Sequence, residues 1–279
     1  MHRFEIKTPL GHAIEVTRFN ASENGDIVVL CSATGVLQKY YAKFASFLSN
    51  NGCTVYTFDY SGIGFSKKQN LRKFDVTLSN WATNDIKSVF EFIKTKHSQQ
   101  KIHCICHSIG GQLLGIVPNN NIFKNIIFVT VQNINHSMWK GFGRVRTFFN
   151  YYFLIPVTVN LVGYLPSKKF MKMENLPKSM ALEFASWGRK KNHVFAYKEK
   201  DQLFYSQIKS KITSYSTEND HFAPKKAVDW MTRKYNNAFV VRKHLKPQDY
   251  EGKQIGHFGF FKAKFEHSIW QEFLSDLQA

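Results

Sequence analysis

The segment HCICHSIGG, residues 103–111, places several chemically active side chains next to one another. Two histidines and two cysteines within five positions suggest a metal site. The end of the same segment suggests instead a nucleophilic serine, Ser108, on a tight turn. The two hypotheses demand different geometries, because metal ligands must converge on one ion whereas a nucleophile must be raised above the sheet that carries it.

The spacing of the His and Cys residues argues against a metal site. Residues 101–107 have the pattern of a strand, in which successive side chains point to opposite faces. His103 and His107 would share one face. Cys104 and Cys106 would share the other face, so the four ligands could not meet at one ion. Zinc sites usually place at least two residues between paired cysteines, but here one residue separates them. We therefore predict no metal and no organic cofactor.

Ser108 has the sequence context of a nucleophile elbow. A predicted strand runs into His-Ser-Ile-Gly-Gly, and an apolar helical segment follows. The elbow pattern is G-x-S-x-G, in which small neighbours relieve crowding around a strained serine. Gly110 occupies the second glycine position, while Cys106 replaces the first. The turn would raise the hydroxyl at the start of a helix, where partial positive charge favours a developing anion.

The elements around this turn alternate between strand and helix. Short apolar runs typical of buried parallel strands are followed by segments with helical periodicity. This order predicts an α/β fold, a mostly parallel eight-stranded sheet with helices on both faces, and it puts chemistry at the carboxyl ends of the strands. The expected strands are 4–7, 13–19, 26–32, 53–60, 101–107, 125–131, 211–216 and 237–245, and helices are expected at 40–52, 81–97 and from 110.

A catalytic serine needs a base and an acid that orients the base. On sheets of this class the chain order is serine, acid, histidine. Asp220 lies in a loop just past a predicted strand, and we prefer it to the nearby Glu218 as the acid. His257 lies in the glycine-punctuated loop after the last strand and is the predicted base.

Two backbone amides are expected to stabilise the oxyanion. One should belong to Ile109, directly after the nucleophile. The other should come from the loop SATGVLQ, residues 32–38, which follows the first buried strand. We predict Thr34 as this donor, with Gly35 and Val36 as alternatives.

The alternating pattern breaks between residues 133 and 205, where aromatic and basic residues mix. We predict that 133–205 form an inserted helical cap, and that 1–132 and 206–279 together form the α/β core. Phe148, Phe149 and Tyr152 are predicted to line an apolar substrate cleft. Packing of these side chains between cap and core is an equally good explanation.

The composition constrains partners and location. There are 38 Lys and Arg against 20 Asp and Glu, a formal net charge of +18. Such a surplus can mark nucleic-acid or anionic-membrane binding, but no nucleic-acid motif is present, so we expect no specific nucleic acid and allow peripheral contact with an anionic membrane. The N-terminus lacks an apolar signal segment and Asn150, Pro156 and Asn160 interrupt the most apolar run. We therefore predict a cytoplasmic protein, of undetermined oligomeric state.

Several motifs together resemble the α/β-hydrolase superfamily, in particular monoacylglycerol-lipase-like and serine-aminopeptidase-like members. The resemblance covers nearly the whole chain and is weakest across the cap. Within it, a group of bacterial predicted α/β hydrolases of unassigned substrate is more similar still. The oxyanion loop departs from the usual His-Gly-x-Gly, since Ser32 replaces the histidine, and the match puts Thr34 at the amide-donating position. The motifs are ATGV, FDYSGIGFS with Asp59, Gly62, Gly64 and Ser66, HSIGGQLLG, HFAP and IGHFGFF.

These observations predict a serine hydrolase that cleaves a small-molecule carboxylic ester, of acyl or lipid type, through Ser108, His257 and Asp220 and an acyl-enzyme intermediate. A peptidase, thioesterase or acyltransferase on the same fold is the alternative. A non-catalytic binding module that keeps the fold is a third hypothesis.

Overall fold

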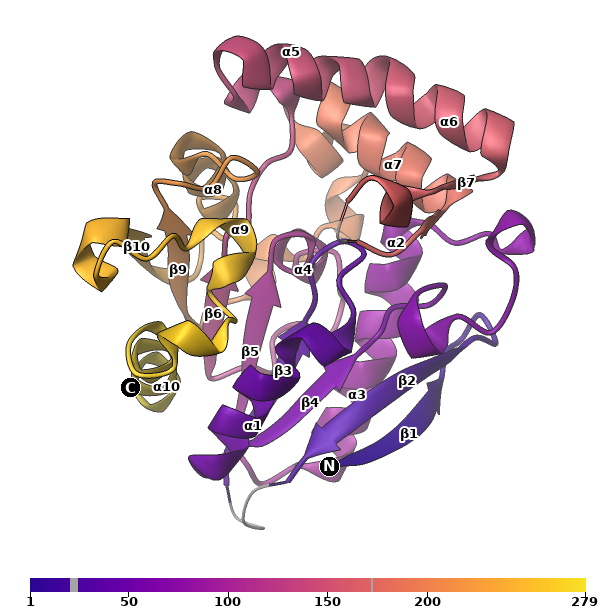
Figure 1. The fold of residues 1–279 in the computed structure, drawn as a ribbon. Helices are drawn as coiled ribbons and strands as arrows, with labels where there is room; N and C mark the ends of the chain where they lie inside the picture. Colours follow the sequence, from indigo (N-terminus) through magenta and orange to yellow (C-terminus); the bar gives the residue numbers. More distant parts are fainter. Residues whose placement is uncertain (21–24, 172) are drawn as a thin grey trace.

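A central sheet of eight strands organises the protein (Figure 1). The computed structural model describes residues 1–20, 25–171 and 173–279. The strands lie in the order β1-β2-β4-β3-β5-β6-β9-β10. Their bounds are β1 (His2–Lys7), β2 (Ala13–Phe19), β3 (Ile27–Cys31), β4 (Thr54–Phe58), β5 (Ile102–His107), β6 (Asn125–Val129), β9 (Lys211–Thr217) and β10 (Phe239–Leu245).

The sheet is mostly parallel, as the sequence predicts. The six strands from β4 to β10 in the sheet order run parallel, and β1 and β2 form an antiparallel hairpin at one edge. The strands β3, β4, β5 and β6 are buried along their whole length. Strands covered on both faces have continuous apolar runs, which is why their sequences lack the polar alternation of a half-exposed strand. The predicted mostly parallel, eight-stranded α/β fold is confirmed.

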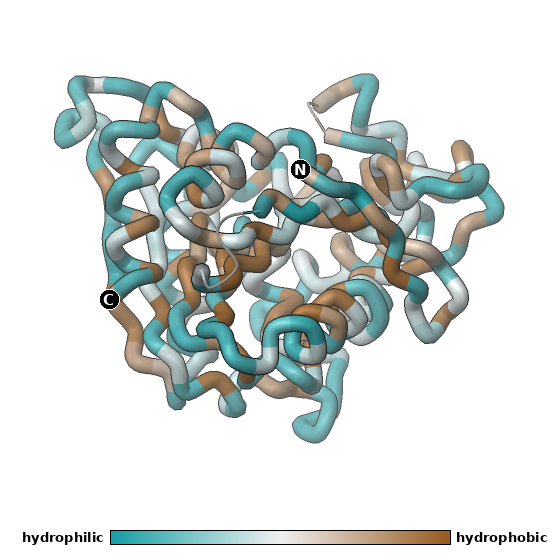
Figure 2. Tube along the Cα trace, turned by 90° about the horizontal axis from the view of Figure 1, so that it is seen from below, coloured by the Kyte–Doolittle hydropathy of each residue, from teal (hydrophilic) through white to brown (hydrophobic). Residues whose placement is uncertain are grey.

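Helices cover both faces of the sheet and create two apolar cores. Alternate residues of β3 point to opposite sides: Val28 and Leu30 join one core, and Ile27 and Val29 join the other. In Figure 2 the tube is mostly brown at the centre of the molecule and mostly teal in the outer loops. The first core contains α1 (Ala42–Asn50) and α10 (Ile269–Gln278), and the second contains α3 (Lys87–Lys96), α4 (Ile109–Leu114) and α8 (Lys225–Thr232).

The helix expected over residues 81–97 is built from two kinds of turn. A short α2 (Leu78–Asn80) leads into a π-helical segment, Trp81–Ile86, and then into α3. The π turn buries the carboxyl group of Asp85, which accepts hydrogen bonds from the backbone and the side chain of Ser61 at 2.7 and 2.8 Å.

The segment between β6 and β9 forms a separate helical layer. Its elements are α5 (Gly141–Phe149), a π-helical segment (Asn150–Leu154), α6 (Ile155–Val162), α7 (Lys178–Arg189) and the small two-stranded sheet β7 (Tyr164–Leu165) and β8 (Leu176–Pro177). Figure 1 shows α5 and α6 running one after the other along one end of the molecule, with α7 beside them. That residues 133–205 work as a cap stays a prediction.

None of the helices in the described ranges combines the length and the apolar character that a bilayer-spanning helix needs.

Candidate active site

Ser108 lies on a sharp turn between β5 and α4. Its backbone has φ 52° and ψ −113°, a positive φ that costs a non-glycine residue about 1–3 kcal/mol and persists only where the surroundings enforce it. The Ser108 amide donates to the carbonyl of Val129 at 2.9 Å, which ties the turn to β6. A Cβ at position 110 would overlap the carbonyl oxygen of Cys31. Gly110 is therefore required because the start of α4 passes directly against the end of β3.

His257 and Asp220 form a buried hydrogen-bonded pair. His257 Nδ1 lies 2.7 Å from Asp220 Oδ2. The second oxygen, Oδ1, accepts the amides of Phe222 and Ala223 at 2.7 and 3.0 Å, so the carboxylate is held in one orientation. Glu218, the alternative acid, is exposed to solvent. Of the two carboxylates, the structure brings Asp220 to His257.

A side chain next to the pair holds the two loops together. Asn219 Oδ1 accepts the amide of Gly256 at 3.0 Å, one residue before the histidine. The hydroxyl of Thr217, at the end of β9, donates to the same oxygen at 3.0 Å. The loop after β9 and the turn α9 (Gly256–Gly259) are thus joined beside the His257–Asp220 pair.

Ser108 and His257 face a common cavity of about 390 Å³. Thr34 also lines this cavity, and so do residues from the layer between β6 and β9, including Arg146, Thr147 and Tyr151. Much of the remaining wall is apolar: Ile134, Leu165, Leu176, Phe184 and Phe258. The cavity therefore joins a hydroxyl and an imidazole, which is hydrogen-bonded to the Asp220 carboxylate, to a largely apolar space.

The comparisons with known proteins agree with this architecture. Residues 22–119 match the model of the family described as Serine aminopeptidase, S33. An esterase from Exiguobacterium antarcticum has a TM-score of 0.65 at 14% identity, with 100% of both chains covered. A thermophilic esterase from Thermogutta terrifontis gives 0.63 at 14% identity, again with 100% of both chains covered. A Pyrococcus furiosus esterase gives 0.62 at 12% identity, covering 100% of this chain and 91% of that one.

The chain has the α/β-hydrolase fold. At these identities the solved structures establish the fold alone. A comparison with curated protein sequences gives no match.

In this structure the serine hydroxyl contacts an amide rather than the imidazole. Ser108 Oγ lies 3.3 Å from both Oε1 and Nε2 of Gln132. Among the hydrogen bonds of the described residues, none joins Ser108 Oγ to His257. Sequence reasoning missed Gln132, although its position three residues past the end of β6 was a usable signal.

The residue before the serine connects three parts of the site. His107 Nδ1 lies 2.9 Å from the hydroxyl of Tyr41, and that hydroxyl accepts the amide of Ala33 at 3.0 Å. His107 Nε2 lies 3.0 Å from the carbonyl oxygen of His257. Burial lowers the pKa of His107 well below its usual value, so the ring is neutral: Nε2–H donates to His257 O, and Nδ1 accepts from Tyr41. This chain of bonds joins the loop before Thr34, the elbow and the base.

The backbone near Thr34 forms a tight turn. The amide of Val36 donates to the carbonyl of Ala33 at 3.1 Å, and Gly35 adopts a φ of 65°. The carbonyl of Gly35 accepts the amide of Glu174 at 2.8 Å. The turn at residues 33–36 is therefore hydrogen-bonded to the core through Ala33 and Tyr41. It is hydrogen-bonded to the layer between β6 and β9 through Gly35 and Glu174. Ile109, the other predicted donor, is the first residue of α4, where backbone amides lack an intrahelical acceptor.

A second predicted motif fixes the far end of the same loop. Asp59 Oδ1 accepts the amide of Gln38 at 2.8 Å, and Oδ2 accepts the amide of Phe65 at 2.9 Å. The carboxyl group is buried, and burial raises its pKa. A Cβ at position 64 would overlap this carboxylate, which explains the glycine there. The segment from Asp59 to Ser66 therefore holds the end of the loop that carries Thr34 in place by hydrogen bonds.

The three predicted pocket residues do not line this cavity. Phe148, Phe149 and Tyr152 are 39%, 54% and 39% exposed, while Arg146, Thr147, Asn150 and Tyr151 from the same helix face the cavity. The prediction assumed that the aromatic side chains of Phe148, Phe149 and Tyr152 point toward the cavity. The helix is instead rotated so that Thr147 and Tyr151 point inward, and this rotation is set by packing on α7 rather than by local sequence.

The cysteines also differ from expectation in one respect. Cys104 and Cys106 share a face, as predicted, with their Sγ atoms 3.4 Å apart. Cys31 from the neighbouring strand joins them, and the three Sγ atoms lie within 4.8 Å of one another. Three thiols this close together could hold a metal ion. The prediction of no metal site compared only the ligands on β5 and so did not include Cys31. Burial raises the pKa of Cys104 and Cys106 well above the usual thiol value, so they pack as neutral, small side chains.

Proposed function

We propose that this α/β hydrolase cleaves a small-molecule carboxylic ester with Ser108 as nucleophile, His257 as base and Asp220 as the acid that orients the base. One observation carries the proposal: Ser108 on its strained elbow and His257, which is hydrogen-bonded to Asp220, line the same cavity. The esterase descriptions of the similar solved structures support the choice of ester over other acyl groups.

The proposed reaction has two steps. His257 takes the proton of Ser108 as Oγ attacks the ester carbonyl, and the alkoxide of the substrate leaves with that proton. Water then attacks the acyl-enzyme, again with His257 as base, and releases the acid. Asp220 holds the Nδ1–H tautomer and stabilises the imidazolium.

The oxyanion of each tetrahedral intermediate would be held by the amides of Ile109 and Thr34. One such donor is worth about 3–4 kcal/mol of transition-state stabilisation in comparable enzymes. The tight turn at Gly35 and the hydrogen bond from the Gln38 amide to Asp59 support a fixed position for the Thr34 amide.

We also propose that residues 133–205 act as a cap on a core formed by 1–132 and 206–279. Arg146, Thr147 and Tyr151 line the same cavity as Ser108. The indole of Trp139 donates to the carbonyl of His221 at 2.9 Å, next to Asp220, which supports a cap anchored at the acid loop.

The test combines a covalent probe with a substrate panel. A fluorophosphonate should label the wild-type protein and the Ser275→Ala control, whose serine is exposed on α10, and should not label Ser108→Ala. p-Nitrophenyl esters of increasing acyl length should be hydrolysed by the wild type and not by Ser108→Ala. Unchanged labelling of Ser108→Ala would refute the site assignment.

A peptidase is the second candidate, because the matching family model is described as a serine aminopeptidase. Aminoacyl p-nitroanilides run beside the esters separate the two functions. Faster cleavage of the anilides at equal concentration would replace the esterase proposal.

A further inference from the structure

Residues 141–162 form one continuous helical stretch whose outer side is apolar. We define the outer face as the exposed apolar residues of α5, the π-helical segment and α6 that point away from the core. Its members are Phe142 (79% exposed), Val145 (63%), Phe149 (54%), Phe153 (50%), Val157 (55%) and Leu161 (81%). Exposed apolar patches of this kind on a monomer mark surfaces that another molecule covers.

The opposite side of the same helices accounts for their packing on the protein. Thr147, Tyr151, Ile155 and Val159, at intervals of four residues, are buried. Folding therefore needs the inner stripe and does not explain the outer face. A helical stretch with a second apolar side that does not pack on the protein has that side available for a different environment.

The charged residues within and directly beside the helical stretch in the sequence are all basic. No Asp or Glu occurs between Glu91 and Glu174. Residues 133–205 contain twelve Lys and Arg against four Asp and Glu. Lys140, Arg144 and Lys169 are exposed at or near the ends of the helical stretch. Apolar side chains with a basic border complement a surface that is apolar inside and anionic outside.

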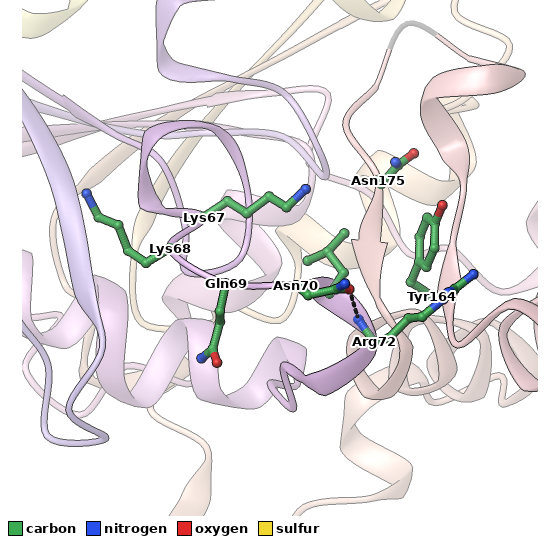
Figure 3. A pocket seen from close by; sticks show the side chains of 8 residues that line it. Lys67, Lys68, Gln69, Asn70, Arg72, Tyr164 and Asn175 are labelled. Carbon is green, nitrogen blue, oxygen red and sulfur yellow. Dashed lines mark hydrogen bonds between the residues drawn. The ribbon is translucent and has the colours of Figure 1, made fainter.

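A basic hollow adjoins the far end of α6. Arg72 Nε donates to the carbonyl of Val162, the last residue of α6, at 3.1 Å. Arg72 and Lys67 line the hollow with Asn70, Tyr164 and Asn175 (Figure 3). Figure 3 shows Lys67 and Lys68 extending in opposite directions, and Lys68 is paired with Glu5 and Glu15. Lys67 and Arg72 thus extend the basic border around the end of the helix.

We propose that the outer face docks on the surface of an anionic lipid bilayer. The helical stretch would lie in the interface with Phe142, Phe149, Phe153 and Leu161 inserted among the acyl chains and the basic border against the headgroups. A second copy of this chain is a poorer occupant, because two borders of the same positive sign would meet.

The position of the docking face relates it to catalysis. Thr147 and Tyr151, on the inner side of the same helices, line the cavity that contains Ser108. One helical layer thus separates the bilayer from the site. This part of the inference rests on the proposed function: the ester would come from the lipid phase.

The first experiment removes apolar surface from the outer face. The full-length protein is mixed with phosphatidylcholine vesicles, with and without phosphatidylglycerol, and the bound fraction is measured by flotation. We expect binding to the anionic vesicles. The double variant Phe153→Ser/Leu161→Ser should bind at least about tenfold more weakly, since each large apolar side chain contributes more than a factor of ten when buried.

A matched control separates this face from apolar surface in general. Leu10→Ser/Phe239→Ser also removes one exposed leucine and one exposed phenylalanine, at 49% and 68% exposure, from the hairpin turn and from β10. The control should bind like the wild type. Equal binding by the outer-face variant and the wild type would overturn the proposal.

The second experiment removes charge. Arg144→Gln/Lys169→Gln should weaken binding to anionic vesicles about tenfold or more, because each basic residue near the surface contributes about 1 kcal/mol. Arg233→Gln/Lys94→Gln removes the same charge from exposed positions just after α8 and on α3 and should have a much smaller effect. High salt should reduce wild-type binding. Equal losses in the two pairs would refute a localised basic border.

The remaining outcomes also decide the question. If wild type fails to float with anionic vesicles, or if it forms a dimer that Phe153→Ser/Leu161→Ser abolishes, a bilayer does not cover this face. Ser108→Ala should bind vesicles as wild type does. Ester hydrolysis without vesicle binding would overturn this inference alone, and vesicle binding without hydrolysis would overturn the proposed function alone.

Discussion

Glu218 and Asp220 are separated by a single residue in the chain and lie in different environments. Asp220 accepts three hydrogen bonds and is buried, whereas the side chain of Glu218 is exposed. A carboxylate can orient an imidazole only if its own position is fixed, and the two backbone amides of the 222–223 turn fix Asp220. At the scale of single residues, the bonding partners decide which of two similar groups can act.

The first prediction compares the two acids. Asp220→Asn should lower kcat by about 10⁴-fold, because an amide at this place favours the wrong imidazole tautomer. Glu218→Gln should leave kcat within about twofold. The measurement is steady-state hydrolysis of a p-nitrophenyl ester. A large loss in Glu218→Gln together with a small loss in Asp220→Asn would reverse the assignment.

The second prediction concerns the amide that contacts the nucleophile. Gln132→Leu removes both groups 3.3 Å from Ser108 Oγ and frees the hydroxyl to rotate toward His257. A neutral hydrogen bond contributes about 0.5–1.5 kcal/mol, so fluorophosphonate labelling should accelerate about two- to tenfold. Gln112→Leu, a buried glutamine on α4, controls for loss of a buried amide. Slower labelling of Gln132→Leu would show that the glutamine assists the nucleophile.

At the scale of elements, the site depends on bonds between loops that follow different strands. His107 at the end of β5, Tyr41 at the start of α1 and Ala33 after β3 form one chain, which ends at the carbonyl of His257. Each strand brings its loop to the same sheet edge. The hydrogen bonds of Tyr41 and His107 then set how the loops lie relative to one another. His107 therefore acts as a positioning residue in the proposed mechanism.

The third prediction tests this positioning role. His107→Phe keeps a flat ring but leaves the Tyr41 hydroxyl and the His257 carbonyl without their partner. kcat should fall about 10- to 100-fold, the size expected for a small displacement of reacting groups, while KM changes less. His107→Gln can restore one bond and should recover part of kcat. A change in KM without a change in kcat would instead indicate a role in binding.

At the scale of the whole molecule, buried carboxyl groups connect stability to pH. Burial raises the pKa of Asp85 to about 7, against the lowering effect of its hydrogen bonds from Ser61. The unfolded chain has an ordinary Asp pKa of about 3.9. Between these values the folded protein binds one more proton than the unfolded chain. The stability contributed by this group is thus full below about pH 4 and is lost as pH rises through about 7.

The fourth prediction follows from that sign. Asp85→Asn cannot ionise and keeps an oxygen that can accept from Ser61. From pH 5 to pH 8 the free energy of unfolding of the wild type should fall relative to that of Asp85→Asn by about 2–3 kcal/mol, at 1.36 kcal/mol per unit of pKa difference. Urea unfolding at both pH values measures the difference. A constant difference would contradict a titrating Asp85.

The sequence by itself determined the strands, their parallel order and the elbow around Ser108. Buried parallel strands and tight turns have local signatures, namely continuous apolar runs and small residues at set spacings, and the predicted α/β sheet is confirmed. The chain order of serine, acid and histidine also reduced the choice among eleven histidines to His257. Their catalytic roles stay predictions.

Only the tertiary structure decided what meets across the sheet. The contact of Gln132 with Ser108, the bond from His107 to His257 and the approach of Cys31 to Cys104 join residues that belong to different strands or loops. The same holds for the rotation of the helical stretch 141–162, whose sequence is apolar on both sides. Local periodicity cannot select between two apolar faces, because the choice depends on the packing energy against α7 and the core.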